Sequence, residues 1–272
     1  MKKIYVNFKR FDIPTDFGGV NSLHPIKTWA SDIIRELDGK LEDFKDIEFT
    51  FLFPETHLIN ALEENPKNIK IGTQGVYRHD VEKGKNFGAF TTFFPASAAK
   101  ALGAKATLIG HCEERNNLKE IIKTVGGDED KLHELLNASV KSAVNRGLDV
   151  LFAIGETVEE QDNWKEVLAK QLEIGLKDVD KDKITIAYEP VWAIGPGKVP
   201  PDKEYIQKIG KFIKEKTNLP VVYGGGLKAD NAKMLSSIPE IDGGLIALTR
   251  FSGDIGFYPE EFLEIVNLYR GV

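Results

Sequence analysis

The sequence predicts an α/β protein, a (β/α)8 barrel formed by a single domain over residues 1–272. Three observations support this prediction: short apolar runs alternate with longer amphipathic stretches, the runs are rich in β-branched residues, and no low-complexity linker divides the chain. Eight such units in 272 residues match a (β/α)8 barrel, which typically has about 250 residues. A doubly wound open sheet is the structural alternative.

The individual elements can be placed from their periodicity. Short apolar runs predict strands at residues 3–8, 47–53, 69–74, 106–110, 149–155, 183–189, 220–224 and 243–248. Amphipathic stretches predict helices that include residues 26–37, 95–102, 130–145, 158–176, 202–217 and 230–236. A last helix is expected to begin near Pro259, because proline suits the first turn of a helix.

Composition excludes several classes of protein. The formal charge is −6, and the lysines are scattered among acidic residues, so no nucleic-acid partner is expected. The only cysteine, Cys112, leaves no internal disulfide and no cysteine-based zinc site, and five dispersed histidines show no metal-ligand spacing. The chain opens directly into a strand and contains no apolar run long enough for a membrane, which predicts a cytoplasmic protein without a membrane partner.

A carboxylate follows the sixth predicted strand. Residues 184–188 are apolar and rich in β-branched side chains, as is typical of a buried strand in a parallel sheet, and Glu189 comes next. Ligands bind at the carboxyl ends of strands in such folds, so Glu189 is a candidate general base beside the glycine-bearing loop that contains Gly195 and Gly197. A helix cap or a solvated loop charge is the alternative interpretation.

The first predicted strand ends in Asn7 and Lys9. Strand alternation predicts that both side chains point to the same side and bring an amide and an ammonium into the mouth of the barrel. An isolated motif of this kind is more often an exposed lysine near a turn.

The fourth predicted strand ends in Gly110 and His111. Glycine permits an unusual backbone angle, and the histidine is expected at a helix N-terminus, where the local positive potential lowers its pKa. A neutral imidazole can donate a hydrogen bond to a substrate oxygen, although a lone histidine after a strand is more often structural. Glu113 either pairs with Lys9 or caps the helix, and the sequence leaves both open.

The seventh predicted strand ends in three glycines, residues 224–226. Their unshielded amide groups would let a phosphate approach closely, or the turn simply requires positive φ angles. The sequence lacks a Walker motif, and Gly195 and Gly197 lack the strand–turn–helix context of a dinucleotide site, so no nucleotide is expected.

Taken together, these motifs resemble those of the triosephosphate isomerase family, in the family's order and over almost the whole chain. The matching motifs are Asn7-x-Lys9, Gly88-Ala-Phe-Thr91, Ile109-Gly-His-x-Glu113, Ile154-Gly-Glu156, Tyr188-Glu-Pro-Val-Trp-Ala-Ile-Gly-x-Gly-Lys198 and Tyr223-Gly-Gly225.

The resemblance implies a TIM barrel and assigns roles to the residues that match. Glu189 resembles the base that moves a proton between adjacent carbons, and His111 resembles the group that polarises the carbonyl. Lys9 and Asn7 would supply positive charge and a hydrogen bond, and Glu113 belongs to the same motif as His111. No cofactor is implied. The segment 190–197 resembles a closing lid.

The substrate phosphate would bind at Gly195, Gly225, Gly226 and the loop after the eighth strand, where the chain departs from the family. Serine is usual where Gly226 stands, and Gly-Gly-Ala-Ser is usual where Ala247-Leu-Thr-Arg250 stands. Leu248 is expected to crowd the phosphate. Arg250 could bind the phosphate in place of the amide groups, or it could be a surface charge on the enlarged segment 251–258.

Other departures lie nearby. Cys112, Glu114 and Gly75 stand where serine, arginine and asparagine are usual, and the loop at residues 10–21 is longer than in the family. These changes keep the proton-transfer groups and alter the anion end. These departures therefore bear on the choice of substrate and not on the proton transfer.

The first hypothesis is an isomerase that interconverts dihydroxyacetone phosphate and glyceraldehyde 3-phosphate, as in glycolysis and gluconeogenesis. A relative specialised for a larger phosphorylated ketose, such as a tetrulose phosphate, is the alternative. A sugar-phosphate sensor without catalysis is the less favoured third hypothesis. The resemblance also implies a homodimer in which residues 75–86 enter a groove on the partner.

Overall fold

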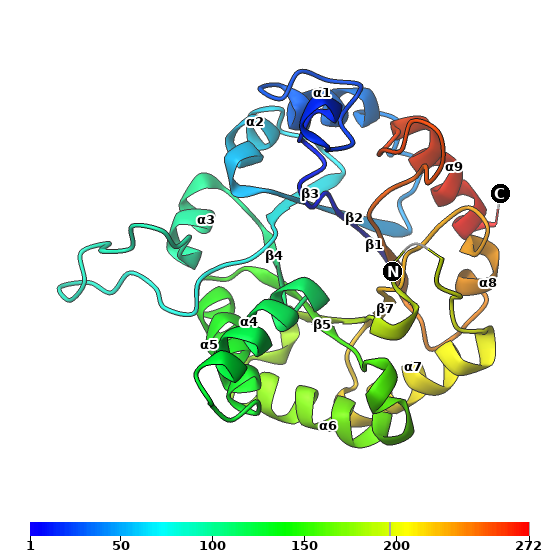
Figure 1. Ribbon diagram of the computed structural model, residues 1–272. Helices are drawn as coiled ribbons and strands as arrows, with labels where there is room; N and C mark the ends of the chain where they lie inside the picture. The colour runs from blue at the N-terminus through cyan, green and yellow to red at the C-terminus, as the bar shows by residue number, and fades with distance from the viewer. Residues whose placement is uncertain (196, 272) are drawn as a thin grey trace.

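Eight parallel strands close into a barrel in the computed structural model, which describes residues 1–195 and 197–271 (Figure 1). Each strand pairs with its neighbours along the chain, and β8 pairs with β1. The prediction of a (β/α)8 barrel is confirmed. The strands are β1 (Lys2–Asn7), β2 (Ile47–Phe53), β3 (Ile69–Thr73), β4 (Ala106–Ile109), β5 (Asp149–Ile154), β6 (Ile184–Tyr188), β7 (Val221–Tyr223) and β8 (Gly243–Ile246).

Helices surround the barrel (Figure 1). They are α1 (Trp29–Leu37), α2 (Leu58–Glu63), α3 (Ala96–Leu102), α4 (Cys112–Thr124), α5 (Lys131–Asn145), α6 (Trp164–Gly175), α7 (Lys203–Thr217), α8 (Ala232–Ser236) and α9 (Pro259–Arg270).

Two of these helices, α2 and α4, lie outside the ranges predicted above. The first is a short helix of six residues, and the second buries only Arg115 and Ile122, so neither has a strong apolar stripe. The predicted helix 158–176 is in fact two elements. A 3-10 helix, η3 (Val158–Asn163), begins with a capping box between Thr157 and Glu160, and α6 follows it.

Apolar side chains fill two layers. One cluster, which includes Leu52, Leu108 and Leu151, occupies the inside of the barrel. The second and larger cluster lies between the strands and the helices, as strand alternation requires. In this outer layer the ring of Phe8 stacks on Phe53 at a centroid distance of 4.4 Å and packs on Phe257 at 4.8 Å. These ring contacts fix the position of the chain where it leaves β1.

The long segment after β1 is held by buried polar contacts. Asp12 is fully buried, and its carboxylate accepts hydrogen bonds from Arg10 at 3.0 and 2.7 Å. The same carboxylate lies 3.0 Å from Nε2 of His57. Phe11 of this segment and Tyr258 of the segment after β8 line one hollow, so the two enlarged loops are neighbours at the rim.

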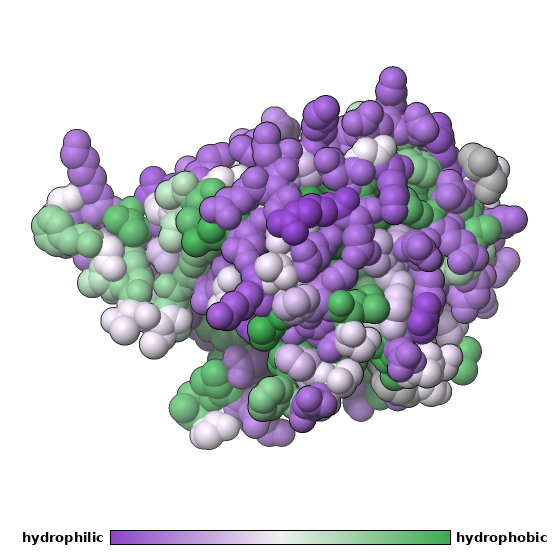
Figure 2. Space-filling view, turned by 90° about the horizontal axis from the view of Figure 1, so that it is seen from above, coloured by the Kyte–Doolittle hydropathy of each residue, from purple (hydrophilic) through white to green (hydrophobic). Residues whose placement is uncertain are grey.

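The segment between β3 and α3 projects from the barrel, at the left of Figures 1 and 2. Phe87 is 85% exposed and Phe93 is 50% exposed, and apolar side chains appear in green on this projection in Figure 2. None of the helices in the described part of the chain is long and apolar enough to cross a membrane.

Candidate active site

The carboxyl ends of β1, β4 and β6 bring three predicted site residues together. Because the strands are parallel, Lys9, His111 and Glu189 all follow their strands at the same end of the barrel. Nε2 of His111 lies 3.4 Å from Oε1 of Glu189. Nζ of Lys9 lies 2.5 Å from Oε1 of Glu113, whose Oε2 is 3.8 Å from Nδ1 of His111. The four side chains therefore form one continuous series of contacts.

Glu189 is buried with only 2% of its surface exposed. Its Oε2 accepts a hydrogen bond from the backbone N–H of Cys112 at 2.9 Å, and its Oε1 has no hydrogen-bond partner among the described residues. Burial raises the pKa of Glu189 to about 8, against the lowering effects of the Cys112 N–H, Arg115 and Lys9. A buried carboxyl group of this kind suits a general base that works near neutral pH.

Gly224 is required by the close approach of this carboxylate. A Cβ atom at Gly224 would lie 2.7 Å from Cγ of Glu189 and 2.9 Å from the carbonyl oxygen of Tyr188. The first glycine of the triplet therefore makes room for the carboxylate of Glu189. Its own N–H donates to the carbonyl of Tyr188 at 2.7 Å and is not available to a phosphate.

His111 caps the N-terminus of α4, as expected. Its Nδ1 accepts the backbone N–H of Glu113 at 3.3 Å, so a neutral ring carries its proton on Nε2, the nitrogen that faces Glu189. Burial lowers the pKa of His111 to about 4, and the charge of Lys9 acts in the same direction. Gly110 has φ 81°, which explains the need for glycine before the histidine.

Lys9 corrects one prediction about the first strand. The strand ends at Asn7, and Lys9 takes φ 42°, so the expected alternation does not extend from Asn7 to Lys9. Asn7 is buried, and its Oδ1 accepts the backbone N–H of Lys9 at 3.1 Å. The carbonyl of Lys9 accepts a hydrogen bond from Gln74 at 2.9 Å. Asn7 and Gln74 thus hold the lysine in a strained conformation.

The sequence left open whether Glu113 pairs with Lys9 or caps the helix. In the structure its side chain pairs with Lys9. Burial would raise the pKa of Glu113, but the hydrogen bond and charge of Lys9 outweigh burial, and the pKa is lowered. The N-terminal hydrogen bond of α4 is instead accepted by His111.

Cys112 adds a third donor atom beside the base and the imidazole. The ligand atoms of His111, Cys112 and Glu189 lie within 4.8 Å of one another, and this is the donor set in the described residues that could hold a metal ion. Burial and the charge of Glu189 raise the pKa of Cys112 to about 12, so the group is a neutral thiol at physiological pH.

The base of the predicted lid is tied to a buried carboxylate that sequence reasoning did not single out as functional. Oε1 of Glu156 accepts hydrogen bonds from Trp192 at 2.8 Å, Tyr188 at 2.9 Å and Tyr205 at 3.1 Å. Trp192 belongs to the 3-10 helix η5 (Val191–Ala193), from which the lid continues. Pro196 at the tip lies outside the described residues, and Gly195 beside it has φ 118°.

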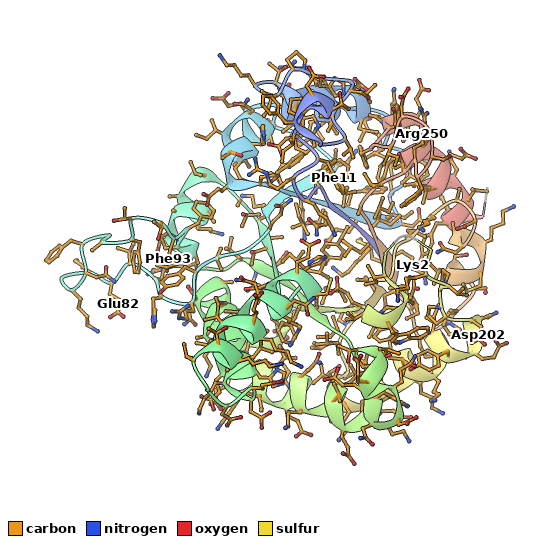
Figure 3. The ribbon with its side chains drawn as sticks, viewed as in Figure 1. Lys2, Phe11, Glu82, Phe93, Asp202 and Arg250 are labelled. Carbon is orange, nitrogen blue, oxygen red and sulfur yellow. The ribbon has the colours of Figure 1, made fainter. Side chains whose placement is uncertain are left out.

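The residues predicted to bind phosphate follow β7 and β8. Gly226 has φ 100°, while Gly225, Ala247 and Leu248 are half-buried. Arg250 lies beside α9 (Figure 3). It has other partners: its Nη2 lies 2.6 Å from Oε1 of Glu261 in α9, and its guanidinium lies 3.6 Å from the Tyr258 ring centroid. Its role as a phosphate ligand stays a prediction.

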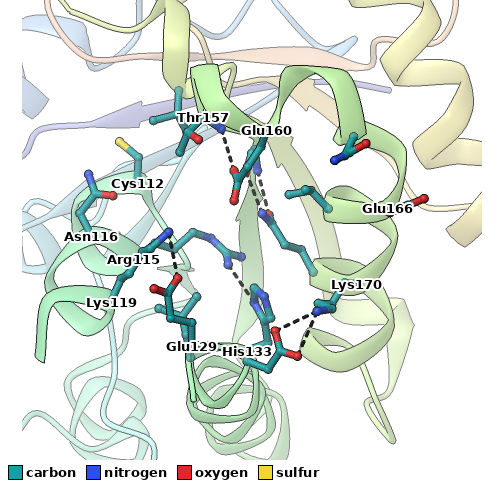
Figure 4. A pocket seen from close by; sticks show the side chains of 17 residues that line it. Cys112, Arg115, Asn116, Lys119, Glu129, His133, Thr157, Glu160, Glu166 and Lys170 are labelled. Atoms are coloured by element: carbon teal, nitrogen blue, oxygen red, sulfur yellow. Dashed lines mark hydrogen bonds and ion pairs between the residues drawn. The ribbon is translucent and has the colours of Figure 1, made fainter. Parts of the chain in front are cut away.

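A hollow of about 340 Å³ lies outside the barrel, between α4, α5 and α6 (Figure 4). Arg115 points toward His133 there, and its guanidinium donates to the carbonyls of Gly110 at 2.7 Å and Ala153 at 2.8 Å. Burial lowers the pKa of Arg115 to about 10. The lysines at the rim are already paired, as in the 3.0 Å contact of Lys119 with Glu129. Arg115 in this hollow thus binds the carbonyl groups at the ends of β4 and β5 from outside the barrel. The hollow is separate from the site formed by Lys9, His111 and Glu189.

Comparisons with known proteins agree with this geometry. A profile of the family described as triosephosphate isomerase matches residues 23–269. The triosephosphate isomerase of Syntrophotalea carbinolica is 31% identical over 262 residues, which are 90% of this chain and 94% of the relative. That of Fusobacterium nucleatum is 32% identical, over 88% of this chain and 92% of the relative.

The crystal structure of triosephosphate isomerase from Bartonella henselae is similar over 99% of both chains, with a TM-score of 0.75 and 26% sequence identity. The barrel, the carboxylate facing an imidazole, and these matches lead to one conclusion. The chain belongs to the triosephosphate isomerase family.

Proposed function

We propose that this protein is an aldose–ketose isomerase that interconverts dihydroxyacetone phosphate and glyceraldehyde 3-phosphate. The observation that carries the proposal is the 3.4 Å contact between Nε2 of His111 and Oε1 of Glu189, a buried oxygen without a hydrogen-bond partner among the described residues. A base and a neutral hydrogen-bond donor that face each other at the mouth of a barrel suit proton transfer next to a carbonyl.

In the proposed mechanism, Glu189 removes a proton from the carbon next to the carbonyl and returns it to the neighbouring carbon. The Nε2–H of His111 donates a hydrogen bond to the substrate oxygen, and the ammonium of Lys9 stabilises the negative charge that develops on the enediolate. Nε2 of His111 then gives its proton to that oxygen and takes up the proton of the neighbouring hydroxyl, whose oxygen becomes the new carbonyl. Asn7 and Glu113 hold Lys9. Closure of the segment after η5 excludes water. No electron leaves the substrate, so these steps need no redox cofactor.

Solvent deuterium tests the proton transfer directly. Isomerisation through an enediol exchanges the proton next to the carbonyl, so the wild-type protein in heavy water should incorporate deuterium into a ketose phosphate. Glu189→Gln should abolish this exchange. If the wild-type protein exchanges no proton with any ketose phosphate, the sensor without catalysis becomes the better proposal.

A larger phosphorylated ketose, such as a tetrulose phosphate, is the second candidate substrate. It is favoured by the altered loops after β7 and β8, where Gly226 and Leu248 replace the family's usual residues. A comparison of kcat/KM for triose and tetrose phosphates separates the two substrates. Triose turnover at least as efficient as tetrose turnover would eliminate the specialised version.

We also propose a cytoplasmic homodimer and a single catalytic domain over residues 1–272. The homodimer proposal is supported by the segment between β3 and α3, whose aromatic side chains Phe87 and Phe93 are exposed in one chain. The shared site at the strand ends supports the single domain.

A further inference from the structure

The loops after β7 and β8 carry two cations, and only one of them has a carboxylate partner. These loops commonly form the phosphate site of a (β/α)8 barrel. Between β7 and α8 the only cationic residue is Lys228, and between β8 and α9 it is Arg250. Arg250 is paired with Glu261, whereas no carboxylate among the described residues lies within ion-pair distance of Lys228.

The amide groups of the loop after β8 are also partly occupied. The backbone N–H groups of Thr249 and Arg250 both donate to the carbonyl of Gly256, at 3.1 Å each. The enlarged segment thus folds back on its own strand end and uses donors that a shorter loop would leave for a ligand. The anion end of the site therefore needs positive charge from elsewhere.

Lys228 is placed to supply that charge. A Cβ atom at Gly226 would lie 3.5 Å from Cε of Lys228, so the lysine stem lies directly beside the place of the family's usual serine side chain. Asn231 fixes this turn, because it accepts the N–H of Lys228 at 2.9 Å and donates to the carbonyl of Gly226 at 2.9 Å. Nζ of Lys228 lies 4.1 Å from the ring centroid of Phe251 in the enlarged segment.

We propose that Lys228 is a phosphate-binding residue of this isomerase, and that its ammonium takes the place of the serine hydroxyl and of the amide donors that Gly256 occupies after β8. The proposal rests on the proposed function for the identity of the ligand. The ring of Phe251 contacts one side of the ammonium of this half-buried lysine, and the N–H donors that point away from the ring are available to phosphate oxygens. The two changes in the loops, Gly226 and the insertion with Phe251, then form one coupled adaptation.

Steady-state kinetics of Lys228→Met test the proposal. The variant should raise KM for the ketose phosphate, and Ki for inorganic phosphate as competitive inhibitor, by about tenfold or more, because it removes a charge-assisted hydrogen bond. Its kcat/KM for unphosphorylated glyceraldehyde should equal that of the wild-type protein. Lys228→Arg should recover most of the phosphate affinity. The matched control is Lys233→Met, which removes an exposed lysine of α8 and should leave all constants unchanged.

The outcomes separate this inference from the proposed function. Unchanged KM and Ki in Lys228→Met, in a protein that turns over the substrate, overturn the role of Lys228 and leave the isomerase standing. If the wild-type protein does not turn over the substrate, the proposed isomerase function is overturned instead. In that event inorganic phosphate should still raise the melting temperature of the wild-type protein more than that of Lys228→Met, and equal shifts overturn the inference. Lys228→Gln replaces the methionine variant if the latter does not fold.

Discussion

A single buried carboxyl group, Glu189, links catalysis to stability. Its Oε1 faces His111 without a hydrogen-bond partner among the described residues, and burial raises its pKa to about 8. The folded protein therefore prefers the neutral acid, whereas the reaction needs the carboxylate. This conflict is the expected property of a base held away from water until the substrate arrives.

The pH dependence of activity follows from this raised pKa. Glu189 is protonated below its pKa, so we expect kcat/KM to fall as the pH drops below about 8. His111 stays neutral over this range, because its pKa is lowered to about 4. Initial rates between pH 5 and 10, with buffers of constant ionic strength, measure the profile. A flat profile across this range would contradict the raised pKa of the free protein.

The pH dependence of stability has a defined sign at the same residue. A folded-state pKa above the ordinary value of 4.5 favours the fold fully below pH 4.5, and this contribution is lost as the pH rises through about 8. Glu189→Gln should therefore unfold at higher urea concentration than the wild-type protein at pH 9. The gain should reach a few kcal/mol, since a pKa difference of one corresponds to about 1.4 kcal/mol.

The difference between the two proteins should shrink toward pH 5. Glu42→Gln, which changes an exposed carboxyl group far from the site, is the control and should show no such trend. Equal stability of Glu189→Gln and the wild-type protein at pH 9 would show that the carboxylate is not penalised by burial.

At the scale of elements, the predicted strands were confirmed because their signal is local. Each buried strand is a short run of apolar residues, and the pattern survives without knowledge of the neighbours. The break after Asn7 was missed because the positive φ of Lys9 depends on Gln74, which lies on another strand end. The contact of Lys228 with Phe251 likewise joins two loops, and no pattern within either loop predicts it.

The contacts that anchor the start of the lid could not be predicted from the sequence either. The sequence marked Glu156 only as part of a family motif, whereas its three hydrogen bonds come from β6, η5 and α7. The convergence depends on tertiary structure, because Glu156 follows β5, whereas its donors Tyr188, Trp192 and Tyr205 lie between β6 and α7, and the pairing of β5 with β6 brings them together. Site residues that act through packing are therefore visible in the fold and not in the sequence.

Trp192→Phe tests whether this carboxylate anchors the lid. The variant keeps an aromatic ring but loses the N–H that donates to Glu156 at 2.8 Å, so the free energy of unfolding should fall by about 1.5–3 kcal/mol. Hydrogen exchange should also speed up at the amides of Val191 and Ala193, which lie in η5.

The matched variant is Tyr205→Phe, which removes another donor to the same oxygen but lies on α7 outside the lid. It should lower stability to a similar degree and leave exchange in η5 unchanged. Equal exchange rates in the wild-type protein and both variants would remove the anchoring role of Trp192.

At the scale of the whole molecule, the segment between β3 and α3 projects from the barrel, and the barrel does not cover its aromatic side chains Phe87 and Phe93. The stretch between β3 and α3 is fixed at its base, where Arg146, which follows α5, donates to the carbonyl of Val81 at 2.6 Å and Asp80 binds Ser97. In the same segment, the ring of Tyr77 stacks on that of Phe93 at a centroid distance of 3.9 Å. An aromatic projection of this kind on an otherwise charged surface is typical of a protein–protein contact.

The proposed homodimer can be tested at this projection. Phe87→Asp places a charge on a side chain that is 85% exposed in one chain, and the charge would be buried without a partner in a dimer. We therefore expect sedimentation equilibrium to give the mass of a dimer for the wild-type protein and of a monomer for the variant. Val125→Asp, at a 76% exposed position after α4, is the control and should remain a dimer. A wild-type protein of 30.3 kDa at every concentration would show that the projection binds no second copy.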